Sequence, residues 1–224
     1  MFIGHFAPAF VVAAAGPRAP KLGTLFVAAQ LVDWGFFALA IAGIEKLRVD
    51  PDATVMVPLD LYHMPYTHSL VGTGVWALGF ALIVALWQRN ALGGFLAGLV
   101  VLSHWLLDWL THRPDLTIAG GSETYGLGLW NFPFIAMPLE LLITVGAFIF
   151  YVRRSRGPIG PPLILLAVLL AFQAVNWFGP EPKEANLMLY IQSLFAFGVA
   201  TAFAVWVGEN RYFLRRGGLA APSE

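Results

Sequence analysis

The 224-residue sequence contains no cysteine and few charged residues. The absence of cysteine excludes a disulfide framework and a metal site built on thiolates. Charged residues make up 12 % of the chain, roughly half of the usual share in soluble domains. The formal net charge is zero, which gives no indication of nucleic-acid binding, so no nucleic-acid partner is expected. The N-terminal residues lack the basic flank of a signal peptide, and we take them as part of the mature protein.

Long apolar runs fill the chain instead. Hydrophobic residues account for 58 % of it, and the mean hydropathy is +0.73. A membrane-spanning helix needs about 20 mostly apolar residues. Seven segments have this character: residues 3–15, 24–44, 68–87, 92–112, 132–152, 162–178 and 185–208. The first is short, so we expect it to be tilted or to enter only part of the bilayer. The sequence predicts an all-α fold, a polytopic transmembrane bundle of six to seven helices.

The basic residues predict an orientation, because lysine and arginine concentrate in cytoplasmic loops. Alternate connections hold nine of them on one side and four on the other. The basic side contains Arg18, Lys21, Arg89, Arg153, Arg154, Arg156, Arg211, Arg215 and Arg216. We therefore place the N-terminus and the second, fourth and sixth connections outside the cytoplasm.

All five histidines fall on this outer side. They are His5, His63, His68, His104 and His112. Chance would scatter five residues over both faces of the membrane, so their convergence predicts a shared site. His5 alone is the weakest member, because a single terminal histidine is often incidental.

The stretch SHWLLDWLTH carries His104, Asp108 and His112, four residues apart. On a helix these side chains stack along one stripe. A histidine nitrogen and a carboxylate oxygen one turn apart can bind the same divalent ion. An ionised aspartate at membrane depth costs roughly 2.5–3.5 kcal/mol, which a bound cation would offset. The alternative is that the histidines are interfacial polar residues and that Asp108 is hydrogen-bonded across helices.

Two further acids, Asp33 and Glu140, lie inside apolar segments. Acids within the membrane are functional candidates, and these two are the candidate catalytic bases. Alternatively, each is protonated or pairs with a polar residue of another helix, for which Gln173 and Asn176 are available.

The stretch HMPYTHS holds His63 and His68 where the second connection meets the third apolar segment. If Pro65 breaks the helix, both histidines can turn toward one site from a loop. Thr67 or Ser69 is expected to cap the following helix.

The long, glycine-rich fourth connection ends in Trp130 and Asn131. Such a loop is often functional, and here it would form a lid over the site. A flexible loop with an interfacial tryptophan is the alternative.

HMPYTHS, then SHWLLDWLTH, then the glycine-rich GLGLWN together resemble a bacterial family of inner-membrane metal-dependent hydrolases. The resemblance covers residues 1–152 and implies a metal-site core there, with accessory helices at residues 162–208, in a single transmembrane domain over residues 1–224. It also implies a multi-pass protein of the bacterial inner membrane, whose site would face the periplasm.

The order of the polar residues is also similar to that in zinc-dependent phospholipase C and its related nucleases. That order here is His5, Asp33, His63 or His68, His104 with Asp108, His112 and Glu140. The similarity implies that Asp33 and Asp108 are shared or bridging ligands and that the histidines are terminal ligands. The N-terminal tryptophan of that fold has no counterpart, and Ala136 stands where it has a histidine before the last acid. One or two ions are therefore expected instead of three.

These observations predict a membrane-bound metal-dependent hydrolase acting near the outer interface on a lipid-like ester or phosphoester. Histidine and carboxylate ligands suit zinc, with manganese or iron as alternatives. Two other functions stay open at this point. One is a transporter or proton-coupled carrier that uses Asp33, Asp108 and Glu140, and the other is a non-enzymatic membrane protein with a structural metal.

Overall fold

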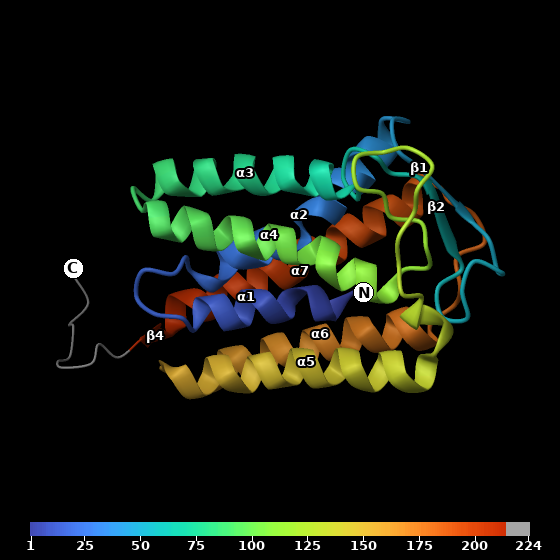
Figure 1. The fold of residues 1–224 in the computed structure, drawn as a ribbon. Helices are drawn as coiled ribbons and strands as arrows, with labels where there is room; N and C mark the ends of the chain where they lie inside the picture. Colours follow the sequence, from blue (N-terminus) through green and yellow to red (C-terminus); the bar gives the residue numbers. More distant parts are fainter. Residues whose placement is uncertain (214–224) are drawn as a thin grey trace.

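Seven α-helices make up most of residues 1–213, the part of the chain that the computed structural model describes (Figure 1). They are α1 (Phe6–Ala13), α2 (Leu22–Ile41), α3 (Leu70–Trp87), α4 (Ala91–Thr111), α5 (Pro133–Arg154), α6 (Gly160–Phe178) and α7 (Leu187–Asn210). Six of these, α2 to α7, are long and apolar enough to cross a membrane. The predicted all-α bundle is thus confirmed. Arg215 and Arg216, which contributed to the predicted orientation, lie outside the described residues.

The helices satisfy their backbone hydrogen bonds internally, which is what a chain in lipid requires. Their starts are capped where the sequence supplies a short polar residue. Ser69 accepts a hydrogen bond from the Gly72 backbone N–H at 2.9 Å and so caps α3. Asn90 caps α4 in the same way, through the backbone N–H of Gly93 at 3.0 Å.

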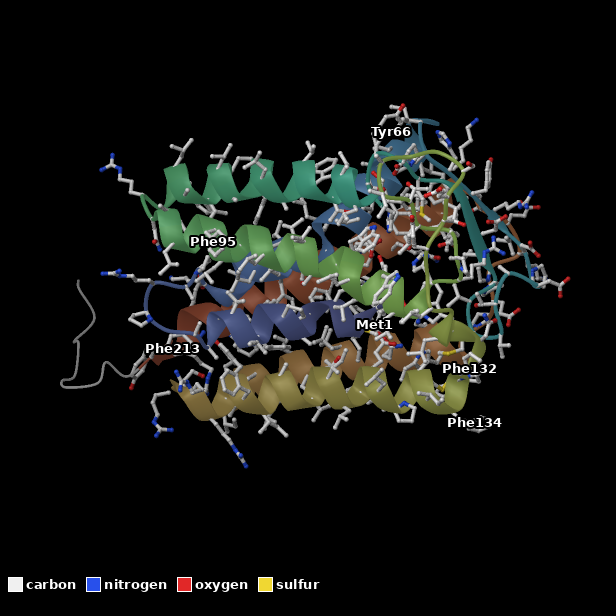
Figure 2. The ribbon with its side chains drawn as sticks, viewed as in Figure 1. Met1, Tyr66, Phe95, Phe132, Phe134 and Phe213 are labelled. Atoms are coloured by element: carbon white, nitrogen blue, oxygen red, sulfur yellow. The ribbon has the colours of Figure 1, made fainter. Side chains whose placement is uncertain are left out.

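The first apolar segment is a short helix inside the bundle. A 3₁₀ turn, η1 (Ile3–His5), leads into α1, and both are buried among α2, α4 and α5. The ring of Phe6 stacks on Phe26 at 4.3 Å, and Phe10 meets Phe26 edge-on at 5.2 Å. Because this segment is too short to cross the bundle, the chain begins in its interior, beside α4. Figure 2 shows Met1 at that position.

Small residues allow α3 and α4 to approach closely. A side chain at Gly94 of α4 would clash with the backbone oxygen of Ala81 on α3. A side chain at Gly98 would come tightly against the Ala81 side chain and the backbone oxygen of Ala77. This is the usual packing of membrane helices, in which glycine and alanine bring two backbones together.

The outer surfaces of the helices are apolar. Phe134 on α5 is 94 % exposed and Phe95 on α4 is 61 % exposed, and both point away from the bundle (Figure 2). Large apolar side chains in contact with water would be unfavourable over such an area, whereas lipid accommodates them. The surface therefore agrees with a polytopic membrane protein.

The two ends of the bundle differ in structure (Figure 1). At one end an antiparallel hairpin pairs β1 (Lys46–Val49) with β2 (Leu59–His63), a feature that the sequence did not predict. At the other end β3 (Ser155–Arg156) pairs with β4 (Tyr212–Phe213). Buried Arg211, which precedes β4, connects the two strands by donating to the side chain of Ser155 on β3 at 2.7 Å. The basic connections and the hairpin thus lie at opposite ends, as the alternation of charge predicted.

Candidate metal centre

Six polar side chains from distant parts of the chain meet at the hairpin end of the bundle. We call them the His–Asp cluster: His5, Asp33, His68, His104, Asp108 and His112. They come from η1, α2, the segment before α3, and α4 with its C-terminal cap. All four histidines are buried, as is Asp108. Asp33 retains a side-chain exposure of 19 %.

The two oxygens of Asp108 face different partners. Oδ2 lies 3.0 Å from Nε2 of His104 and 3.7 Å from Nε2 of His68. Oδ1 lies 3.0 Å from Nε2 of His5 and 3.6 Å from Nε2 of His112. The amino group of Met1 is 3.2 Å from the same Oδ1 atom. Asp108 therefore stands between two sets of nitrogen atoms.

Asp33 completes one of these sets. Its Oδ1 atom is 3.3 Å from Nε2 of His68 and 3.6 Å from Nε2 of His104. Two groups in the described residues have donor atoms within 4.8 Å of one another: Asp33 with His68 and His104, and His5 with His104 and Asp108. His104 belongs to both groups, and only one of its nitrogens is directed at them.

The spacing of these atoms suits a shared ion. Two atoms bound to one tetrahedral zinc, with bonds of about 2.0–2.2 Å, lie roughly 3.4 Å apart. The nitrogen–oxygen separations in the His–Asp cluster run from 3.0 to 3.7 Å. Small movements of side chains would therefore convert them into a coordination sphere.

Hydrogen bonds at the far side of three rings determine which nitrogen faces the carboxylates. Nδ1 of His104 donates to the backbone oxygen of Ala29 at 2.8 Å, because a carbonyl can only accept. Nδ1 of His112 donates to Oδ1 of Asp115 at 2.9 Å. In the neutral form of each ring, Nε2 then carries a lone pair. Such outer partners are the usual means of orienting a metal-binding histidine.

Two consecutive hydrogen bonds orient the ring of His68. The Thr67 hydroxyl donates to Oε2 of Glu45 at 2.6 Å, which leaves its oxygen to accept from Nδ1 of His68 at 2.8 Å. Glu45 also accepts from the backbone N–H groups of Tyr66 and Thr67, at 2.8 and 3.0 Å. Buried Glu45 thus fixes the loop before α3 and, through Thr67, the orientation of the His68 ring.

A lone pair on Nε2 that faces carboxylate oxygens is electrostatically unfavourable unless a cation lies between them or the ring is protonated. Nε2 of His104 is buried and forms no hydrogen bond. One divalent cation between these nitrogen and oxygen atoms can accept a lone pair from each of them, so the donor set fits a metal ion.

His5 is positioned by stacking. Its ring lies on that of His104, with centroids 3.7 Å apart and an angle of 11° between the planes. Its Nε2 atom faces Asp108, while its buried Nδ1 atom forms no hydrogen bond. The predicted convergence of His5 with His104 is therefore seen in the structure.

Glu140 holds the beginning of the chain. Its Oε1 atom accepts from the backbone N–H of Phe2 at 2.7 Å and of Gly4 at 3.0 Å. Its Oε2 atom accepts from Nε2 of Gln173 at 3.3 Å, and Gln173 in turn accepts from the N–H of Ile3. Gln173 is thus one of the two partners that the sequence offered. These bonds fix the segment that carries His5.

The structure does not bring His63 to the His–Asp cluster. His63 is exposed at the end of β2, where it pairs with Lys46 across the hairpin. The chain then continues through buried Met64, so that only His68 of HMPYTHS turns inward. We therefore leave His63 out of the ligand set.

The glycine-rich connection lies over the start of α3. The N–H groups of Leu70 and Val71 donate to the backbone oxygens of Thr117 and Ile118, at 2.9 and 2.8 Å. It ends in a 3₁₀ turn, η2 (Leu129–Asn131), where the ring of Trp130 lies 4.4 Å from that of His112. The expected position of Trp130 at the site is thus observed.

An ion-pair group joins the hairpin to the end of α4. Buried Asp60 of β2 pairs with Arg48 of β1 at 2.7 Å and with Arg113, the residue after His112. Arg113 also lies 3.5 Å from Asp115, which orients His112. The hairpin is therefore tied to the segment that holds a cluster histidine.

A cavity of about 380 Å³ adjoins the His–Asp cluster. Asp33, His68, Asp108 and His112 line one part of it, with Trp130 beside them. The rest of its wall comes from Met1 and Phe2, α2, the hairpin, Glu140 of α5, α6 and α7, and it is mostly aromatic and aliphatic. The cluster is therefore open to a ligand on one side.

Several residues that hold the cluster could not be identified from the sequence. Glu45 lies 22 residues before Thr67, and Ala29 contributes only its backbone oxygen. Thr67, next to His68, and Asp115, three residues after His112 in HRPD, are the partners whose spacing was visible in the sequence.

Comparison of the chain with protein-family models, with curated proteins and with solved structures gives no match in any of the three cases. The function must therefore be inferred from the geometry of the site.

Proposed function

We propose that this protein is a membrane-bound metal-dependent hydrolase whose His–Asp cluster holds one or two divalent ions, with zinc as the best fit. One observation carries the proposal. Three buried imidazoles, each with Nδ1 engaged elsewhere, direct Nε2 at the oxygens of Asp33 and Asp108. Imidazole nitrogen with carboxylate oxygen is a donor set that zinc accepts, and manganese and iron are the alternatives.

The ligands divide into two sets. Asp33, His68, His104 and Oδ2 of Asp108 would hold one ion. Oδ1 of Asp108 with His5 and His112 would hold a second ion with lower affinity. Asp108 would then be shared by both sets, because only this carboxylate has its two oxygens directed at different histidines within the described residues.

When bound, a divalent cation lowers the pKa of water from 15.7 to about 7 and polarises an ester or phosphoryl oxygen. We assign to the second oxygen of Asp33, the one not directed at His68 and His104, the task of accepting the proton from water, because Asp33 is the more exposed carboxylate of the cluster and lines the cavity. Glu140 has both oxygens in hydrogen bonds, so we assign it the positioning of the His5 segment.

The cavity supports a lipid-like ester or phosphoester as substrate, because its wall beyond the cluster is mostly apolar. The basic connections at the opposite end support a site that faces the periplasm in a bacterial inner membrane. The lipid bilayer is the partner that this arrangement implies.

Elemental analysis of the detergent-purified protein, combined with an assay of ester and phosphoester hydrolysis, tests the proposal. We expect stoichiometric zinc, manganese or iron, and hydrolysis that a chelator removes and the same ion restores. Absence of tightly bound metal, together with ion-coupled flux in liposomes, would instead establish the carrier based on Asp33, Asp108 and Glu140. Bound metal without hydrolysis of any ester would establish a structural metal.

A further inference from the structure

The cavity beside the His–Asp cluster has a polar region and a larger apolar one. Asp33, His68, Asp108 and His112 line it at the cluster, and Asn176, Gln192 and Ser193 are the polar residues that α6 and α7 contribute. Much of the remaining wall is apolar and comes from Phe36, Phe37, Phe172, Trp177, Leu189 and Phe197. A ligand that fills this space must therefore have a polar end and an apolar end.

The wall toward the hairpin is apolar as well. Leu47 of β1, Leu59 and Leu61 of β2, and Met56 and Val57 between the strands line the cavity there. None of these side chains offers a hydrogen bond to a polar solute that arrives from water. The hairpin therefore acts as an apolar cover over the end of the bundle.

The exposed part of the cavity lining points to a mouth between α6 and α7. Among the described residues that line the cavity, four are exposed: Val175, Asn176, Pro180 and Gln192. All four belong to the last turns of α6, to its connection with α7, or to the first turns of α7. The side chain of Val175, for example, is 67 % exposed. In a bilayer this mouth would open toward lipid near the head-group level, where Asn176 and Gln192 meet polar surroundings.

The size of the cavity sets a limit on its occupant. Small-molecule pockets begin at about 300 Å³, and this one measures about 380 Å³. It can hold a head-group linkage and the first part of one acyl chain. The remainder of the lipid would extend through the mouth into the bilayer.

We propose that the occupant is a single membrane lipid, which enters sideways between α6 and α7. Its ester or phosphoester linkage lies at the His–Asp cluster and its acyl chain lies against the aromatic wall. This inference rests on the proposed hydrolase function for the fate of the lipid, but the binding site itself does not require turnover.

Two small residues of α7 determine how much space the cavity offers to the acyl chain of the lipid. Ser193 and Ala196 are half-buried and line the cavity. A larger side chain at either position would occupy the space of the acyl chain without touching the cluster. Ala202, six residues further along α7, is exposed and does not line the cavity, so it offers a matched control.

The test uses the full-length protein with its bound metal and a non-hydrolysable diether phospholipid as the probe. Native mass spectrometry measures how much diether lipid is retained. Ala196→Trp is expected to lower its affinity by at least about tenfold, whereas Ala202→Trp keeps the wild-type value. Ser193→Leu, a smaller change, is expected to act in the same direction and serves if Ala196→Trp does not fold. Among hydrolysed esters, Ala196→Trp should lower the ratio of long-chain to short-chain rates.

The outcomes separate the two proposals. Wild-type lipid retention in both Ala196→Trp and Ser193→Leu, or an equal loss in Ala202→Trp, overturns the lateral lipid site. Hydrolysis of water-soluble esters by a wild-type protein that retains no diether lipid also overturns it and leaves the hydrolase intact. Retention of the lipid that depends on Ala196 without hydrolysis of any ester supports the lipid site and refutes the hydrolase.

Discussion

On α4, Nε2 of His104 lies 3.0 Å from Oδ2 of Asp108, one helical turn further along the chain. The opposite nitrogen of His104 donates to the backbone oxygen of Ala29 on α2, so the ring cannot rotate without losing that bond. The pair therefore has a fixed geometry, and both side chains are buried. Such an arrangement is stable only if a proton or a metal ion lies between the two groups.

Replacement of either member of this pair should remove bound metal. We expect Asp108→Ala to lose all of it, because Asp108 faces both sets of histidines. His104→Ala should lose at least the ion shared with Asp33. Elemental analysis after dialysis against a weak chelator measures both. His63→Ala is the control, since His63 is exposed on β2 and should keep the wild-type content. Full metal content in both cluster variants would exclude these residues as ligands.

A separate prediction concerns the two hydrogen bonds that link Glu45, Thr67 and His68. Thr67→Val keeps the shape of the side chain but removes the hydroxyl that accepts from Nδ1 of His68. Outer partners of metal-binding histidines contribute about 10–100-fold to metal affinity, and we expect a loss of that size in a chelator competition assay. Thr67→Ser restores the hydroxyl and should restore the affinity. A purely structural role would instead lower the thermal stability of both variants and leave their metal affinity unchanged.

The sequence predicted the helices well because each has a long, uniformly apolar run between glycine, proline or polar residues. It also predicted that His104, Asp108 and His112 share a site, since a spacing of four fixes one helical face. The prediction that His68 belongs to that site rested on charge alternation along the chain, and the prediction for Asp33 rested on the order of the polar residues. The packing of α2 and α3 against α4 is what brings them there.

The sequence could not separate His63 from His68. Both occur in HMPYTHS, and only the formation of the short hairpin turns His63 outward. The strands KLRV and LDLYH are too short and too mixed in polarity to be recognised in advance. The bonds from Glu140 to Phe2 and Gly4 were equally hidden, because they depend on how far the first segment enters the bundle.

Glu140 should therefore behave as a positioning residue. Glu140→Gln keeps an oxygen that can accept from the N–H groups of Phe2 and Gly4. We expect it to retain its metal, with a small decrease in thermal stability. Glu140→Leu leaves both N–H groups without an acceptor, and each buried unsatisfied group costs about 1–3 kcal/mol. That variant should unfold at a clearly lower temperature and bind metal more weakly, because the segment that carries His5 is released.

The role of Glu140 is tested by measuring, for each variant, both the temperature of thermal unfolding in detergent and the metal content. Loss of metal in Glu140→Gln at unchanged stability would make Glu140 a ligand. Retained metal and stability in Glu140→Gln with an almost complete loss of turnover would make it the catalytic base.

The orientation of the bundle can be tested with single cysteines, because the natural sequence contains none. His63→Cys places a thiol on the exposed end of β2, at the end that carries the His–Asp cluster. Ala15→Cys places one in the exposed connection after α1, beside the basic residue Arg18, at the opposite end. An impermeant maleimide added to cells with a permeabilised outer membrane should label the first variant directly, and the second only after the inner membrane is disrupted. The reverse pattern would place the cluster at the cytoplasmic face, where its substrate would have to come from the inner leaflet.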